Sequence, residues 1–156
     1  SKVMKKDLER ELERRSRRGQ PFCIAMTRID GAENCQDHEK VKLAAKNVQK
    51  TIRSFDDAYV MGSGEFLLSL KHTDVNGAMR FSTRLAEALK MDLDVKFTMS
   101  CCVAEPMPGD SIDDLLTNTR KDLDYIAELG AGASGQYEDI SPLGRYVQSL
   151  KDSNKE

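Results

Sequence analysis

The chain has 156 residues, and its 24 Lys and Arg against 26 Asp and Glu give a formal net charge of −2. This balance argues against a surface dedicated to nucleic acid polymers. Hydrophobic residues make up 39% of the chain, which is enough for one ordinary core and excludes a disordered chain. No apolar run approaches the roughly 18 residues of a membrane span, and residues 1–6 lack the apolar stretch of a secretory signal. We therefore expect one cytoplasmic domain that contacts neither a membrane nor a nucleic acid polymer.

The first third of the chain predicts a helix, a strand and a second helix. Residues 3–18 are strong helix formers and predict a mostly solvated helix that ends at residues 19–21. Residues 22–26 are apolar and predict a short buried strand, and residues 37–53 carry apolar residues in a three-and-four rhythm that predicts a helix. Val3, Leu8 and Leu12 lie among the helix formers of the first of these helices.

The middle of the chain predicts a hairpin followed by a helix and a strand. Two apolar runs, at residues 58–61 and 65–70, flank a glycine-rich turn, which is typical of a tight hairpin. Asp74 is placed to cap a helix that runs to Leu89, and residues 95–104 return as a strand.

The last third predicts one helix and a polar tail. Ser111 provides a capping-box-like start for a helix that Gly130 terminates. The remainder is Gly/Ser-rich and then polar, with one short helix predicted over residues 142–150. The elements together predict an α+β fold of ferredoxin-like type, a mostly antiparallel central sheet flanked by helices.

The cysteines and histidines indicate no catalytic or metal centre. The four cysteines have no C-x-x-C spacing, and the adjacent pair points to opposite faces of a strand, so we expect buried free thiols. His38 and His72 stand apart from any arrangement of carboxylate and nucleophile.

The hairpin turn, Gly62-Ser63-Gly64-Glu65-Phe66, resembles the name-giving motif of GGDEF domains, which make or bind cyclic di-GMP. The R-x-x-D run from Arg53 to Asp56, the strand from Thr98 to Ala104 and the Gln-Pro-Phe at residues 20–22 stand at the family's spacings. The resemblance covers about residues 9–137 and implies the nucleotidyl cyclase palm-like fold of that family. We accordingly divide the chain into a linker with the first helix (1–18), a degenerate GGDEF domain (19–140) and a polar tail (141–156).

The resemblance also implies where an active member would hold metal. Such a member uses two carboxylates to bind two Mg²⁺ ions that activate the attacking hydroxyl and neutralise triphosphate charge. At these two positions this chain has Arg28, a cation, and Gly64, which has no side chain, while Glu65 fills the next position. We therefore expect no bound metal and no cofactor.

The substrate-binding parts of the family pattern are altered as well. The stretch after the first strand that reads the guanine base is shortened. Gln36 and Asp37 are what remains of its Asn-Asp pair. In the phosphate clamp, Glu128 stands at the lysine position and Gly132 at the arginine position. An anion facing a triphosphate is repulsive, so we expect no catalytic residue and no cyclase activity.

A second site implied by the resemblance is retained. In the family an R-x-x-D motif and an arginine on the next helix bind a stacked pair of cyclic di-GMP molecules, and Arg53, Asp56 and Arg84 occupy these positions. A guanidinium donates two parallel hydrogen bonds to guanine O6 and N7, and a carboxylate accepts from N1–H and N2–H. We expect all three side chains on exposed faces or helix ends.

The leading hypothesis is a catalytically inactive cyclic di-GMP receptor in bacterial second-messenger signalling. A divergent active diguanylate cyclase and a ligand-free interaction or dimerisation module remain as alternatives. We further expect a ligand-dependent homodimer, because the resemblance implies a site that bridges two domains through the stacked nucleotide pair. We also expect flanking domains or a protein partner within a larger signalling protein, because the family's usual D-x-L-T opening is missing from residues 1–7.

Overall fold

The computed structural model describes residues 2–31, 37–62, 64–107 and 109–136. In chain order its elements are α1 (Lys2–Arg18), β1 (Phe22–Ile29), α2 (His38–Thr51), β2 (Asp57–Gly62), β3 (Glu65–Lys71), α3 (Val75–Met91), β4 (Met99–Ala104), α4 (Ile112–Glu128) and β5 (Ser134–Gln136). No described helix has the length and hydropathy needed to cross a lipid bilayer.

The strands form one sheet in the order β2-β3-β1-β4-β5. β1 lies at the centre and is antiparallel to both β3 and β4, and β2 is antiparallel to β3. Only β5 runs parallel to its neighbour, β4. This confirms the prediction of an α+β fold with a mostly antiparallel sheet.

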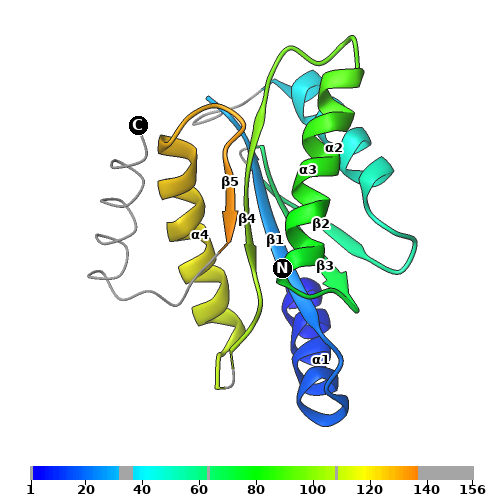
Figure 1. Cartoon of the computed structure of the whole chain (residues 1–156), viewed down its shortest axis with the longest axis vertical. Coiled ribbons are helices and arrows are strands. Elements are labelled where there is room, and N and C mark those ends of the chain that lie inside the picture. Colours follow the sequence, from blue (N-terminus) through cyan, green and yellow to red (C-terminus); the bar gives the residue numbers. More distant parts are fainter. Residues whose placement is uncertain (1, 32–36, 63, 108, 137–156) are drawn as a thin grey trace.

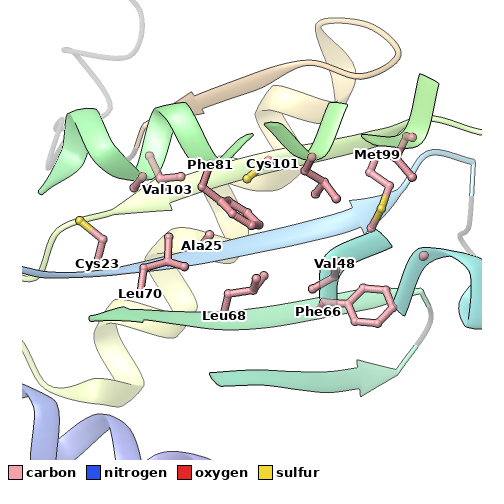
Figure 2. Packing of buried hydrophobic residues seen from close by; sticks show 14 of the residues in the cluster. Cys23, Ala25, Val48, Phe66, Leu68, Leu70, Phe81, Met99, Cys101 and Val103 are labelled. Carbon is pink, nitrogen blue, oxygen red and sulfur yellow. The ribbon is translucent and has the colours of Figure 1, made fainter. Parts of the chain in front are cut away.

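Helices cover both faces of the sheet (Figure 1). α2 and α3 pack on one face, where Phe81 of α3 lies among side chains from β1, β3 and β4, including Ala25, Leu68 and Cys101 (Figure 2). α1 and α4 pack on the other face, where Leu8 and Leu123 are fully buried. Alternate residues of the central strands therefore serve two cores, which is why β1 is buried along nearly its whole length.

Two of the predicted helix caps are confirmed. The Asp74 carboxylate accepts a hydrogen bond from the Gly77 backbone N–H at 2.8 Å, and the Ser111 hydroxyl accepts one from Asp114 at 3.1 Å. Each cap satisfies a backbone donor that the first turn of a helix leaves without a partner.

The buried thiols are also confirmed for the cysteines that the structure describes. Cys23, Cys101 and Cys102 are buried and free, while Cys35 lies outside the described residues. Burial raises the pKa of Cys23 and of Cys101 to about 12, so these thiols stay protonated and unreactive at neutral pH.

Some boundaries and faces differ from prediction. In α1, Met4, Leu8 and Glu11 share the buried face, and Val3 is exposed. β1 continues to Ile29, and β4 begins at Met99 rather than at residue 95. β5 was not predicted, and the helix predicted at 142–150 lies outside the described residues.

Candidate ligand-binding site

The R-x-x-D motif lies in the turn between α2 and β2, where Asp56 connects two backbone segments. Its Oδ2 accepts hydrogen bonds from the Arg53 backbone N–H at 3.1 Å and from Arg53 Nε at 3.2 Å. Its Oδ1 accepts from the Lys71 backbone N–H at 3.0 Å. The Asp56 side chain is only 2% exposed, so the carboxylate joins this turn to the end of β3.

The expectation that Asp56 lies on an exposed face is therefore wrong. The physical reason is that its oxygens accept from two backbone N–H groups of otherwise separate segments, and such buried polar groups are satisfied within the protein. In this structure Asp56 acts as a positioning residue for Arg53. The two arginines of the predicted set, Arg53 and Arg84, are exposed as expected.

Four groups hold the Arg53 guanidinium in one place. Besides Asp56, its Nη2 donates to the Lys71 carbonyl oxygen at 2.7 Å and to the Thr73 hydroxyl. Its Cζ atom lies 4.5 Å from the centroid of the Phe55 ring, a cation–π contact. Within the described part of the chain, Nη1 donates no hydrogen bond and remains for a ligand.

Arg53, Asp56 and Arg84 line a single hollow of about 460 Å³, here named the arginine hollow. Arg80, one helical turn before Arg84 on α3, lines it too. Neither Arg80 nor Arg84 makes an ion pair or a side-chain hydrogen bond with any described residue. The hollow thus brings the three predicted residues together and adds an unpaired guanidinium that sequence reasoning missed.

Residues at the start of α3 and in the turn before it also line the arginine hollow. Gly77 lines it, and a Cβ atom there would lie 2.9 Å from Thr73 Cγ2, so any larger residue would force the Thr73 side chain to shift. His72 in that turn has a φ of 52° and meets the Phe55 ring edge-on, with ring centroids 6.0 Å apart. An aromatic pair therefore borders the Arg53 guanidinium.

The position of Arg80, which was not predicted, could have been inferred from the sequence. Arg80 precedes Arg84 by four residues on a predicted helix, which places both on one face. His72 and Phe55 belong to different turns, and only the pairing of β2 with β3 brings them together.

At the opposite end of β1, the positions at which the resemblance places metal carboxylates hold a cluster of ion pairs. Arg28 donates to Glu65 Oε2 from Nε at 3.2 Å and from Nη2 at 3.0 Å, and from Nη1 to Asp124 Oδ1 at 2.6 Å. Arg120 of α4 donates to the other Glu65 oxygen, Oε1, at 3.0 and 2.9 Å. We name these four residues the Arg28 cluster.

These residues do not fit the two Mg²⁺ ions of the family. Both oxygens of Glu65 already accept from guanidinium groups, and its side chain is 9% exposed. Burial lowers the pKa of Arg28, but hydrogen bonds and charge from Asp124 and Glu65 outweigh burial and raise it, so this cation stays charged. Gly64 supplies only backbone, with a φ of 72° that suits glycine and a carbonyl that accepts from the Ile29 N–H at 3.0 Å.

The hollow beside the Arg28 cluster is acidic. It has a volume of about 900 Å³, and its charged lining consists of Arg28 against Asp30, Glu65, Asp124 and Glu128. We name it the acidic hollow. A triphosphate placed there would face an excess of carboxylates.

Asp30, at the end of β1, and Asp37, left from the base-reading stretch, both have structural roles. Asp30 accepts from the Thr98 hydroxyl at 2.5 Å, from the Ser100 hydroxyl at 2.6 Å and from the Gly132 N–H at 2.7 Å. Asp37 caps α2 by accepting from the backbone of residues 39 and 40. Gln36 and Ser63 lie outside the described residues. Across the ranges that the structure describes, no group of three or more His, Cys, Asp or Glu side chains is placed to hold a metal ion.

Solved structures of GGDEF domains share this fold. The active GGEEF domain of a diguanylate cyclase from Vibrio cholerae matches with a TM-score of 0.77 at 19% identity, over 88% of this chain and 96% of that one. The GGDEF domain of DgcB from Caulobacter crescentus, solved in complex with c-di-GMP, matches with a TM-score of 0.70 at 18% identity, over 86% and 88% of the two chains. These matches confirm the predicted GGDEF-domain fold.

A longer protein matches over part of its length. The diguanylate cyclase SiaD from Pseudomonas aeruginosa, solved in complex with its activator SiaC, has a TM-score of 0.74 at 21% identity over 87% of this chain, which spans 57% of SiaD. No protein-family model and no curated protein matches the sequence.

Proposed function

We propose that this chain is a receptor domain for cyclic di-GMP that lacks cyclase activity and serves second-messenger signalling. The observation that carries the proposal is that Arg53, Arg80 and Arg84 line one hollow, with the last two lacking any partner in the described chain. DgcB, which has the same fold, was solved with c-di-GMP bound.

The chemistry of the arginine hollow suits this ligand. Its acidic lining residues are Asp56, which is buried against Arg53, and Asp74, which caps α3. Arg80 and Arg84 therefore leave an excess of positive charge for the two phosphates of the ligand. Guanidinium groups also hydrogen-bond the O6 and N7 edge of guanine and stack on its plane.

The proposed loss of cyclase activity is supported by the Arg28 cluster. A fixed guanidinium fills the end of β1, and the Glu65 oxygens accept four hydrogen bonds from Arg28 and Arg120. The acidic lining of the adjoining hollow disfavours a triphosphate, with Glu128 where the resemblance places a lysine.

Assembly is part of the same proposal. A ligand that contacts two copies of the domain binds the dimer more tightly than the monomer. It therefore shifts the equilibrium toward the dimer. We expect cyclic di-GMP to shift the chain toward a homodimer, and flanking domains or a protein partner to respond to that shift.

Calorimetry with cyclic di-GMP and with GTP plus Mg²⁺ on one preparation tests the proposal. Saturable binding of cyclic di-GMP without turnover of GTP is the expected result. Binding of neither nucleotide would instead favour the ligand-free interaction module. Formation of pppGpG or cyclic di-GMP from GTP would favour the divergent cyclase.

A further inference from the structure

A second cationic hollow lies away from the arginine hollow and shares no lining residue with it. It has a volume of about 630 Å³ and lies between the start of α2, the C-terminal half of α3 and the segment that leads into β4. Three lysines line it, Lys40 from α2, Lys90 from α3 and Lys96 from the segment before β4. We name it the lysine hollow.

The three lysines have no ionic partner among the described residues. Other lysines of α2 do, since Lys42 pairs with Glu39 at 3.8 Å and Lys46 pairs with Asp92 at 3.4 Å. The acidic residue that lines the lysine hollow is Asp30, whose oxygens already accept hydrogen bonds from Thr98, Ser100 and Gly132. With three lysines against one carboxylate, the described lining of the hollow carries an excess of positive charge.

Its remaining lining is largely apolar. Leu89 of α3, Met99 of β4, and Val95 and Phe97 between these elements contribute to it. No arginine, asparagine or glutamine is found among its described lining residues, so the described part of the lining has no planar donor fork. The apolar lining lies below the flexible ammonium groups of the lysines. This arrangement suits a ligand with an apolar group between anionic groups.

The surface beyond Lys90 also carries apolar side chains. Met91 and Leu93, at the turn after α3, are 81% and 87% exposed. They border a neighbouring hollow whose charged lining is balanced, with Lys46 and Lys50 against Asp92 and Asp94. Large apolar side chains exposed next to lysines indicate contact with another macromolecule, because a small ligand would fit inside a single hollow.

We propose that the lysine hollow binds an acidic peptide segment of a partner protein, in which a large apolar side chain is flanked by Asp or Glu. The apolar side chain occupies the floor at Phe97, and the carboxylates pair with Lys40, Lys90 and Lys96. Because the acidic hollow adjoins at Asp30 and would repel the carboxylates, the segment runs away from it, toward Met91 and Leu93. This site is independent of cyclic di-GMP binding at the arginine hollow.

Fluorescence anisotropy with the full chain tests this site, using a labelled Glu-Asp-Leu-Phe-Glu-Asp peptide as the probe. We expect saturable binding that weakens with salt and that falls at least about tenfold in a Lys40→Ala/Lys90→Ala/Lys96→Ala variant. The matched control is Lys2→Ala/Lys6→Ala/Lys121→Ala, which removes the same charge from exposed lysines elsewhere and should bind within about twofold of wild type.

Three results would overturn the proposal. Equal weakening in both lysine variants would mean unspecific charge attraction. Equal binding of a Glu-Asp-Ser-Gly-Glu-Asp peptide would remove the role of the apolar floor. Displacement of the first peptide by inorganic tripolyphosphate at lower concentration than by unlabelled peptide would assign the hollow to a phosphate ligand.

Discussion

Arg28 and Glu65 face each other in the register of β1 and β3, and two nitrogens of the Arg28 guanidinium donate to one oxygen of Glu65. Arg120 holds the other oxygen from α4. The carboxylate of the glycine turn is thus fixed by cations that belong to the chain itself. This arrangement ties the end of the hairpin to β1 and α4 through ion pairs.

Removing Arg28 should destabilise the fold. Arg28→Ala leaves Oε2 of a 9% exposed carboxylate without a donor and also frees Asp124, so we expect a loss of about 1–3 kcal/mol in the free energy of unfolding. Arg17→Ala, which breaks an exposed pair with Glu13 on α1, should cost less than about 0.5 kcal/mol. Urea unfolding measures both, and equal losses would show that the Arg28 cluster contributes no more than a surface pair.

Replacing the two altered metal positions should not restore cyclase activity. Arg28→Asp with Gly64→Asp returns two carboxylates, but Glu128 and the acidic hollow remain. Each missing interaction with the transition state is worth several kcal/mol, about two or more orders of magnitude in rate. Product analysis by chromatography after incubation with GTP and Mg²⁺ checks this, and any cyclic di-GMP formed above the wild-type level would contradict it.

Asp56 and Arg84 should differ sharply in their effect on stability. Asp56→Asn removes an acceptor from a buried carboxylate that binds two backbone N–H groups and Arg53, so we expect a loss of about 1–3 kcal/mol. Arg84→Ala removes an exposed side chain without a described partner and should stay within about 0.5 kcal/mol of wild type. Thermal unfolding distinguishes them, and matching melting temperatures for both variants would refute the positioning role of Asp56.

Alkaline pH should weaken the docking of α1 on the sheet. Burial raises the pKa of Tyr59, and so does the hydrogen bond that its hydroxyl donates to Asp7 Oδ2 at 2.7 Å. Since the folded-state pKa lies above the unfolded value near 10, this stability is complete below about pH 10 and is lost as the pH rises toward the folded-state pKa.

The comparison with Tyr59→Phe isolates this effect. The difference in unfolding free energy between wild type and the variant should be constant from about pH 7 to about pH 9 and should shrink above about pH 10. Urea unfolding across this range measures it. A difference that stays constant to about pH 11 would show that the contact with Asp7 does not hold the phenol in its neutral form.

Local signals sufficed for most of the fold. Asp74 and Ser111 marked helix starts because each side chain caps its own first turn, and the glycine turn marked the hairpin between β2 and β3. β5 could not be predicted, because its three residues have no apolar alternation and it forms through pairing with β4. The buried face of α1 was not predicted, because the direction in which the helix docks decides which residues it buries.

The sequence indicated several residues that line the arginine hollow, but not what each of them contacts. The resemblance to GGDEF domains pointed to Arg53, Asp56 and Arg84, and all three line one hollow. The burial of Asp56 depends on the Lys71 N–H, which only the β2–β3 pairing brings near. The contacts of Arg28 with Asp124 and of Glu65 with Arg120 likewise join residues of β1 and β3 to α4, which no local pattern encodes.

The measurement that tests the central proposal most directly is calorimetric titration of cyclic di-GMP into wild type, Arg84→Ala and Arg18→Ala. Arg84 lines the arginine hollow without a described partner, whereas Arg18 is an exposed arginine at the end of α1. We predict that Arg84→Ala lowers the affinity about ten- to a hundredfold, since a guanidinium–guanine contact is worth about 1–3 kcal/mol, while Arg18→Ala stays within about twofold. Wild-type affinity in Arg84→Ala, with an unchanged circular dichroism spectrum, would contradict the assignment of cyclic di-GMP to this hollow.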